Sequence, residues 1–235
     1  MHGIPVIVKD NIETTGPVPT TVGSFALENN VTDRDAPLVA LLRAAGAVIL
    51  GKANLSEWAN FRSNDSTSGW SAVGGLTRNP YALDRNTCGS SSGSAVAAAA
   101  SLAAGAVGTE TDGSITCPAS SNGVVGFKPT VGLVSRRFVV PISHSQDTAG
   151  PMTRSVRDAA IMLGAMAGVD PGDPATAAAQ GRVSNYAGLL GRDVLNGLQI
   201  GVPRDRLGDD EALIAQFEQV LDMLRAQGVT IVDIA

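Results

Sequence analysis

Cysteine and histidine, on which many metal sites and disulfide frameworks depend, are scarce in this sequence. Its 235 residues contain two cysteines, Cys88 and Cys117, and two histidines, His2 and His144. Two cysteines are too few for a disulfide framework, and the four residues together do not favour a structural zinc site. We therefore expect no bound metal.

Basic clusters and long apolar runs are also missing. The chain has 17 Lys and Arg residues against 22 Asp and Glu residues, a formal net charge of −5, and no run of Lys or Arg. This balance argues against a nucleic-acid-binding or anionic-membrane surface. No apolar stretch reaches the roughly 18 residues of a membrane span, and no signal peptide is visible. We expect a soluble protein, cytoplasmic by default, with a small and weakly charged partner.

What the sequence does contain is an alternation of strand-like and helix-like segments. Hydrophobic residues make up 44% of the chain, enough for one large core. Strands are expected at 3–10, 47–53, 106–108, 198–203 and 229–235, and helices at 35–46, 94–105, 155–168 and 209–228. This order predicts an α/β fold with a largely parallel sheet and helices on both faces.

The organisation of the chain favours a single domain over residues 1–235. Residues 169–185, rich in Asp, Gly, Pro and Ala, are expected to form a surface linker-like segment. The chain starts and stops on apolar strands without caps. Because such strands leave an edge to be covered, we expect a fragment truncated at both ends.

A serine cluster, "CGSSSGSAVAAAAS" at 88–101, precedes an alanine-rich helix. One serine suffices as a helix N-cap, so three in a row leave hydroxyls to account for. A second polar loop follows the strand at 106–108 and reads "TETDGS", ending at Ser114. Such a loop can point successive backbone amides at one spot, as an oxyanion requires, although Ser114 is also compatible with an ordinary turn serine.

A nucleophilic serine needs a proton acceptor, and the candidates are few. His2 and His144 are the two histidines, and Lys9 ends the first expected strand. An ordinary lysine, with a pKa of about 10.4, is neutral in only about one molecule in two thousand at pH 7. Burial at the end of a covered strand can lower that pKa by about three units.

A different motif, "GAVILGKA" at 46–53, has the spacing of a phosphate-binding loop centred on Lys52. Ala53 stands where a magnesium-binding hydroxyl is needed, and the residues between the glycines are apolar. We therefore favour a helix stop followed by a buried strand, and keep a nucleotide binder as a remote alternative.

Lys9 in "PVIVKDNI", Ser90 in "CGSSSGSA" and Ser114 in "GTETDGSI", followed by "GVVGFKPTVGLVS" and "DTAGPMTRSVRDAA", together resemble the amidase signature family, most closely its bacterial peptide amidases. The resemblance runs from Gly3 to about Gly168, and the spacing of 24 residues from Ser90 to Ser114 matches the family's. It implies an α/β fold with a mixed central sheet, here incomplete, and hydrolysis of amide bonds by a Ser-Ser-Lys triad.

The resemblance also implies individual roles. Ser114 would be the nucleophile, and Ser90, after a cis peptide bond, would relay protons between Ser114 and neutral Lys9. Ser91 would support the relay, and Asp147 would hold the loop structurally. The oxyanion hole would be formed by the backbone amides of Thr111, Asp112, Gly113 and Ser114. No metal or cofactor is implied, and the substrate would be a small-molecule or peptide amide.

The chain departs from the family pattern at three points. Cys88 replaces a glycine before the bridging serine, where we expect a packed thiol, and Thr116 stands where many members have an arginine. Family members are about twice as long. This length leaves two alternatives open: a non-catalytic fragment, or an amidotransferase A-type subunit that needs partner chains. Trp58, Phe61 and Trp70 are expected either to line the cleft or to fill the core.

Overall fold

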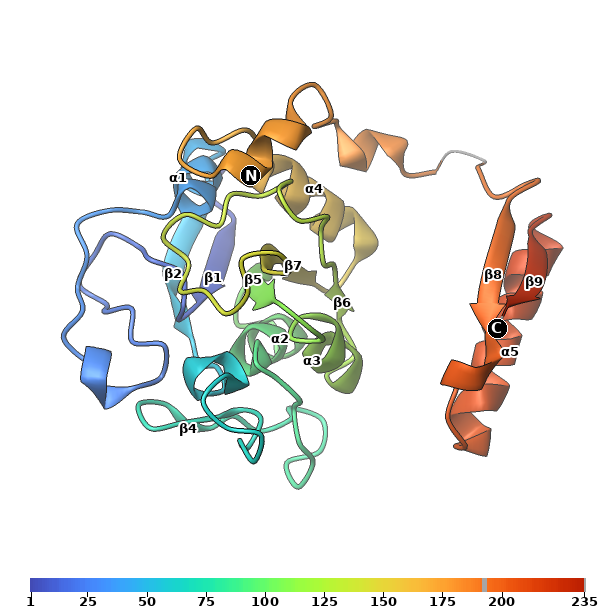
Figure 1. The fold of residues 1–235 in the computed structure, drawn as a ribbon, viewed down its shortest axis with the longest axis horizontal. Coiled ribbons are helices and arrows are strands. Elements are labelled where there is room, and N and C mark those ends of the chain that lie inside the picture. The colour runs from blue at the N-terminus through green and yellow to red at the C-terminus, as the bar shows by residue number, and fades with distance from the viewer. Residues whose placement is uncertain (192–193, 235) are drawn as a thin grey trace. The chain divides into compact units, whose positions relative to one another are not determined.

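The computed structural model describes residues 1–191 and 194–234, and its chain divides into two compact units, Met1–Gly188 and Leu189–Ala235. Figure 1 shows both units. Within the described residues, no helix combines the length and the apolar character that crossing a bilayer demands.

A five-stranded sheet lies at the centre of the first unit, in the order β2-β1-β5-β7-β6 (Figure 1). Its strands are β1 (Pro5–Lys9), β2 (Val48–Ala53), β5 (Gly105–Glu110), β6 (Val125–Gly126) and β7 (Thr148–Thr153). The strands β2, β1 and β5 run parallel, whereas β7 is antiparallel to both β5 and β6. The expected mixed, largely parallel sheet is confirmed.

Helices cover both faces of this sheet (Figure 1). They are α1 (Pro37–Ala44), α2 (Ser92–Ala99), α3 (Thr116–Ser121) and α4 (Val156–Met166). The main core joins α1 and α4 to buried Val6, Val8 and Val107 of the strands. A smaller core around Ile115 and Met152 joins α2 and α3 to β7 on the other face. Apolar burial on both faces is what stabilises such a sheet.

Shorter elements complete this unit. The 3-10 helices are Phe25–Leu27, Glu57–Asn60, Pro174–Ala179 and Tyr186–Leu189, the last of which ends just beyond the unit. Residues 60–87 form the expected irregular excursion, with one small hairpin of β3 (Trp70–Ser71) and β4 (Gly75–Leu76).

The second unit pairs β8 (Gln199–Pro203) in parallel with β9 (Thr230–Ile234), joined through α5 (Glu211–Ala226). Arg204–Arg206 forms a 3-10 turn after β8. Asp210 caps α5 by accepting hydrogen bonds from the amides of Ala212 and Leu213. These elements lie where the sequence predicts them.

Two local expectations were wrong. The alanine-rich helix ends at Ala99, because the chain turns through Ser101, whose φ is 58°. The strand β2 lies at the sheet edge, with Val48 47% exposed, instead of being buried. The segment 169–185 is mostly exposed, and its side chains Asp170, Asp173 and Thr176 are buried.

Candidate functional site

The parallel pairing of β1 with β5 brings Lys9 to the carboxyl end of the sheet beside Thr109. Val8 is in register with Val107, so Lys9 follows at the strand end where Thr109 also lies. The Lys9 side chain is completely buried. Its Nζ lies 2.7 Å from Ser90 Oγ and donates hydrogen bonds to the Thr109 carbonyl oxygen at 3.1 Å and Thr109 Oγ1 at 2.9 Å.

This environment makes the amine of Lys9 a feasible base. Burial lowers the pKa of Lys9 from its ordinary 10.5 to about 7, and the negative charges of Glu110 and Asp147 oppose this shift without cancelling it. A neutral amine has two N–H bonds and one lone pair. The two N–H bonds would then donate to the two oxygens of Thr109, and the lone pair would accept a hydrogen bond from Ser90 Oγ.

Ser90 and Ser91 lie in the turn that leads into α2. The Gly89–Ser90 peptide bond is cis, and both serines are completely buried. Ser91 Oγ donates to the Thr109 carbonyl oxygen at 3.0 Å and accepts from the Thr109 amide at 3.2 Å. Gly93 packs against the Asn54 backbone so closely that a Cβ there would collide with it. Backbone contacts thus hold the serine cluster against β5 and β2.

Ser114 lies in the turn before α3, next to the serine cluster. Its carbonyl oxygen accepts a hydrogen bond from the Ser91 amide at 3.1 Å, and the residue is 8% exposed. Within the described residues the Ser114 hydroxyl forms no hydrogen bond, so the geometry joins Ser114 to the cluster through the backbone. Lys9 and Ser90, in contrast, meet directly through their side chains.

The loop before Ser114 is where the oxyanion hole is expected. Gly113 has a φ of 76°, which favours glycine there. In the described chain the amides of Thr111, Asp112 and Ser114 donate to no other backbone carbonyl as loop hydrogen bonds. The Gly113 amide contributes to lowering the pKa of Glu110, so Thr111, Asp112 and Ser114 remain the candidate donors.

Glu110 belongs to the site although the sequence did not single it out. This buried carboxylate accepts hydrogen bonds from the Ile115 amide at 2.6 Å and the Thr116 amide at 2.8 Å. Burial acts to raise the pKa of Glu110, but the amides of Thr116, Ile115 and Gly113 and the charge of Lys128 outweigh it, so the pKa lies below its usual value. The sequence signal that could have indicated Glu110 is its acidic side chain within the otherwise polar loop "TETDGS".

Lys128 supplies positive charge beside this carboxylate. Its Nζ lies 3.7 Å from Glu110 Oε1 and donates to the Thr111 carbonyl oxygen at 2.7 Å. Thr116, which stands where many members of the resembled family carry an arginine, contributes only its amide and a hydroxyl contact of 3.2 Å to Glu110. The charge thus comes from a residue further along the chain.

Replacing Glu110 by glutamine is expected to lower activity by on the order of 10- to 100-fold, because it removes the charge that faces Lys128 and places an amide NH₂ beside that ammonium, while the backbone amides share the one remaining acceptor oxygen. The Glu110 charge also raises the Lys9 pKa. Its removal should move the acid limb of the pH–activity profile to lower pH. Thr116→Val, which removes only the hydroxyl contact, is the matched control. Unchanged activity and an unmoved acid limb would contradict this role.

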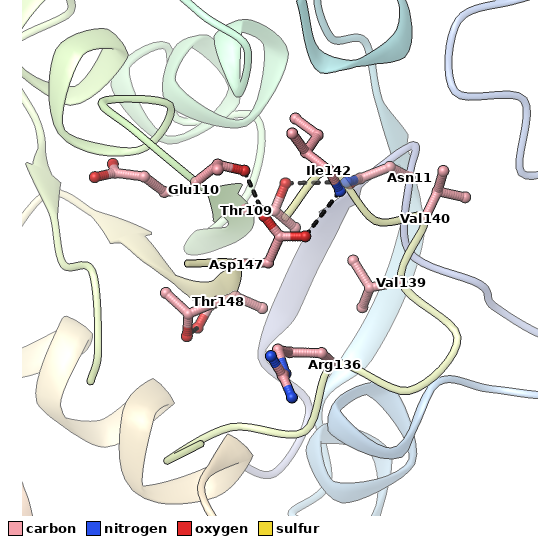
Figure 2. A pocket seen from close by; sticks show the side chains of 11 residues that line it. Asn11, Thr109, Glu110, Arg136, Val139, Val140, Ile142, Asp147 and Thr148 are labelled. Atoms are coloured by element: carbon pink, nitrogen blue, oxygen red, sulfur yellow. Dashed lines mark hydrogen bonds between the residues drawn. The ribbon is translucent and has the colours of Figure 1, made fainter. Parts of the chain in front are cut away.

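Asp147 contacts the loop that contains Thr111 and the segment that contains Ile142, and Figure 2 shows its carboxylate directed at Ile142. It accepts hydrogen bonds from Thr111 Oγ1 at 2.5 Å and from the amides of Ile142 and Ser143 at 2.8 and 3.0 Å. A cavity of about 10 Å³ lies among these groups, Thr109 and Asn11. This is about the smallest space that can hold one water molecule. The carboxylate is placed to hold the loop.

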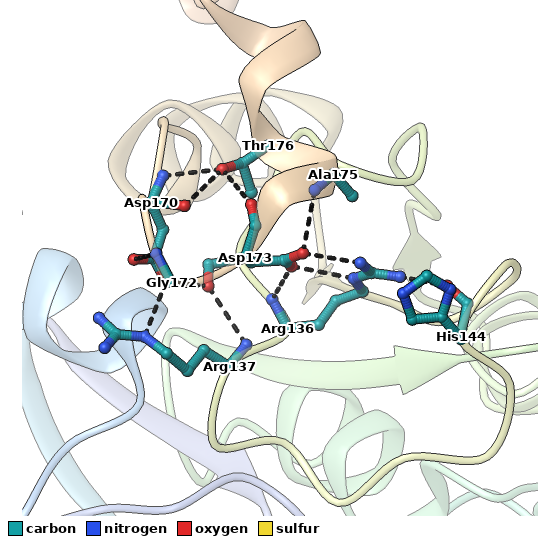
Figure 3. A network of polar contacts seen from close by, with 9 residues as sticks. Arg136, Arg137, His144, Asp170, Gly172, Asp173, Ala175 and Thr176 are labelled. Atoms are coloured by element: carbon teal, nitrogen blue, oxygen red, sulfur yellow. Dashed lines mark hydrogen bonds and ion pairs between the residues drawn. The ribbon is translucent and has the colours of Figure 1, made fainter.

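His144 lies apart from the serines, in a network around Arg136 (Figure 3). Arg136 pairs with Asp173 at 2.7 Å and also donates to the His144 carbonyl oxygen. The His144 side chain is exposed and so is that of His2. Neither imidazole forms a hydrogen bond with the described residues. The network instead ties residues 136–137 to Asp170 and Asp173.

The expectation of unpaired cysteines was wrong. Cys88 and Cys117 form a disulfide with a Cα–Cα distance of 5.9 Å, across a sequence separation of 29 residues. A disulfide needs Cα atoms within about 7 Å, a condition that the fold creates between the turn before α2 and the first turn of α3. Cys88 is therefore a cross-link and not a free packed thiol.

The structure also places Lys52 and the aromatic side chains that the sequence singles out. Lys52 contacts the Ile12 carbonyl oxygen, Thr20 Oγ1 at 2.9 Å and Asp10 at 3.9 Å within the fold, so its amine is engaged where a phosphate would need it free. Phe61 is 70% exposed and Trp70 is 37% exposed, so neither side chain fills the core.

No group of three His, Cys, Asp or Glu side chains in residues 1–191 and 194–234 could hold a metal.

Comparison with known proteins agrees with this arrangement. The structure matches the native peptide amidase from Stenotrophomonas maltophilia with a TM-score of 0.95 and 58% identity, covering 99% of this chain and 48% of that one. A peptide amidase in complex with the competitive inhibitor chymostatin matches with the same TM-score of 0.95 and 58% identity, covering 99% of this chain and 48% of that one. A putative amidase of Arthroderma benhamiae is 46% identical over 99% of this chain and 40% of its own.

The A-type subunit of the glutamyl-tRNA(Gln) amidotransferase of Symbiobacterium thermophilum is 44% identical, with 98% of this chain and 46% of its own length covered. The chain thus spans less than half the length of these relatives. The family described as Amidase matches residues 1–235, the whole of the sequence. By this match, and by the relatives that share its fold, the chain belongs to the amidase family.

Proposed function

We propose that this protein hydrolyses carboxylic or peptide C-terminal amides through Lys9, Ser90 and Ser114 and an acyl-enzyme. The observation that carries the proposal is the contact of 2.7 Å between the Lys9 amine and Ser90 Oγ, made by a completely buried lysine whose pKa is lowered to about 7. Membership of the amidase family supports amide hydrolysis in general.

In the proposed reaction Ser114 Oγ attacks the amide carbonyl carbon. Its proton passes to Ser90, whose own proton passes to the lone pair of Lys9. Free amides of the 111–114 loop stabilise the oxyanion. The relay then runs backwards and protonates the departing ammonia or amine. Water, deprotonated along the same path, releases the acid and restores Ser114.

A peptide C-terminal amide is the proposed substrate class because the peptide amidase of S. maltophilia is 58% identical to this chain. The substrate pocket itself remains a proposal, since this chain covers 48% of that protein. A C-terminal amide carries no charge at the scissile bond, which suits a buried site whose base must be neutral.

Ammonia release from a peptide C-terminal amide, with mass spectrometry of the acid product, tests this proposal. The same peptide with a free carboxylate is the blank. His144→Ala is expected to retain activity within about threefold, because its imidazole contacts no group of the site. Loss of activity in His144→Ala, with full activity in a Lys9 variant, would indicate a histidine-based hydrolase instead.

A second candidate function is that of an amidotransferase A-type subunit, favoured by 44% identity to a protein of that kind. That role uses the same amide-cleaving residues but delivers ammonia to a partner chain. Glutamine hydrolysis that rises markedly on addition of partner chains would support it. Chain that is folded but inert under both assays would instead identify a non-catalytic fragment.

A further inference from the structure

We propose that Cys88 and Cys117 are positioning residues, whose disulfide holds the Ser90 turn and the Ser114 turn at the separation that proton relay requires. The inference rests on the proposed function. Cys88 lies two positions before Ser90, and Cys117 lies three positions after Ser114. The cross-link therefore joins the Ser90 turn to the first turn of α3, which directly follows Ser114.

Besides the apolar packing of α2 against α3, few hydrogen bonds among the described residues link these two segments. The Ser91 amide donates to the Ser114 carbonyl oxygen at 3.1 Å, and Asn122 Nδ2 donates to the Thr87 carbonyl oxygen at 2.9 Å. Both are single hydrogen bonds, each of which can open transiently. The disulfide is the covalent member of this set, so it limits how far the turns separate when the hydrogen bonds open.

The segment that precedes Ser90 has little packing against the rest of the chain. Residues 83–86 are exposed, and the chain becomes buried only at Thr87. The Lys9 amine holds Ser90 from the sheet side, but Ser114 is tied to the cluster through its backbone. Displacement of one hydroxyl by about 1 Å can lower the rate of a positioned reaction on the order of 100-fold. A disulfide between these segments therefore affects the proposed proton transfer from Ser114 to Ser90.

The disulfide is open to chemical reduction. Cys117 is exposed and Cys88 is partly exposed. A small dithiol can attack one sulfur, form a mixed disulfide and close on itself. The two thiol hydrogens of the reagent then end on the two cysteines, and the reagent leaves as a cyclic disulfide. Where thiols are kept reduced, the tie would be absent.

The test compares oxidised protein with protein reduced by a dithiol and alkylated, with the state of both cysteines verified by mass. We expect kcat for amide hydrolysis to fall on the order of 10- to 100-fold, with KM changed less than about threefold. Exchange of the Ser91 amide hydrogen should accelerate, because its acceptor belongs to the Ser114 turn. The variant Cys88→Ala/Cys117→Ala should behave like reduced protein and ignore the reagent.

Circular dichroism and thermal melting distinguish this effect from unfolding, and the double variant is assayed below its own Tm. Unchanged kcat together with unchanged exchange at Ser91 in fully reduced protein would overturn the inference. Failure of the proposed function has another signature: oxidised protein that hydrolyses no amide. Exchange at Ser91 then still decides whether the disulfide holds the two turns together.

Discussion

Replacing Ser114 by alanine is expected to lower kcat/KM for amide hydrolysis on the order of 10⁴-fold or more, with the fold intact. Without the hydroxyl no acyl-enzyme forms, and only binding and the loop amides remain to assist water. The missing oxygen makes no hydrogen bond within the described residues, so thermal stability should change little. Steady-state kinetics on a peptide C-terminal amide and a melting curve measure both effects.

Ser92→Ala is the matched control for this prediction. Ser92 lies in the neighbouring serine cluster at 88–101, and its buried hydroxyl has no hydrogen-bond partner in the described chain. We expect its activity within about threefold of the unaltered protein, because no step of the proposed relay passes through it. Equal losses in the two variants would mean that the cluster acts only through packing.

Replacing Lys9 by methionine is expected to lower kcat/KM on the order of 10³-fold or more, because the relay loses its proton acceptor. Methionine has a similar length and suits a buried site. Lys52→Met removes another buried amine, one whose pKa is lowered to about 8. The folded Lys52→Met protein should keep the activity of the unaltered protein and the same midpoint in its pH–activity profile. Comparable activity in both variants would exclude Lys9 as the base.

The pH dependence of the enzyme follows from the lowered pKa of Lys9. In the proposed mechanism the neutral amine is the active form, so kcat/KM should rise about tenfold per pH unit below the midpoint and level off above about pH 7. An ordinary lysine would place this midpoint near 10.4. A profile measured from pH 5 to 10 with no limb near 7 would contradict the assignment.

The same amine makes stability depend on pH, with a definite sign. Unfolded protein binds the proton up to about pH 10.5, whereas folded protein releases it above about pH 7. Because the unfolded state binds more protons between these values, the free energy of unfolding should rise with pH across that window. In Lys9→Met this rise should be smaller, and denaturant unfolding at several pH values measures the difference.

Much of the site could be predicted because its residues end or follow regular elements. Lys9 is marked by its place at the end of an apolar strand, and Ser90 by an excess of hydroxyls before a helix. Side chains at the carboxyl ends of neighbouring parallel strands converge, which is why Lys9 and Thr109 meet. The mixed sheet and the covering helices followed from alternation and from family resemblance.

The missed features have no local pattern. The disulfide joins residues 29 positions apart, and only the packing of α2 beside α3 brings them within reach. Glu110 continues strand β5 although polar residues at its end indicate a loop. Its amide partners come from the following helix. Alanine carries no stop signal, so the early end of α2 depends on the backbone at Ser101.

The alternation of side chains along β1 has one more consequence. Val6 and Val8 enter the apolar layer shared with α1 and α4, and the next side chain, that of Lys9, leaves on the opposite side. Insertion of one residue in this strand would reverse that order and drive an amine into hydrocarbon. A shift of one residue would therefore displace both the proposed base and the apolar side chains of the core. We expect the five residues of β1 to tolerate no insertion or deletion.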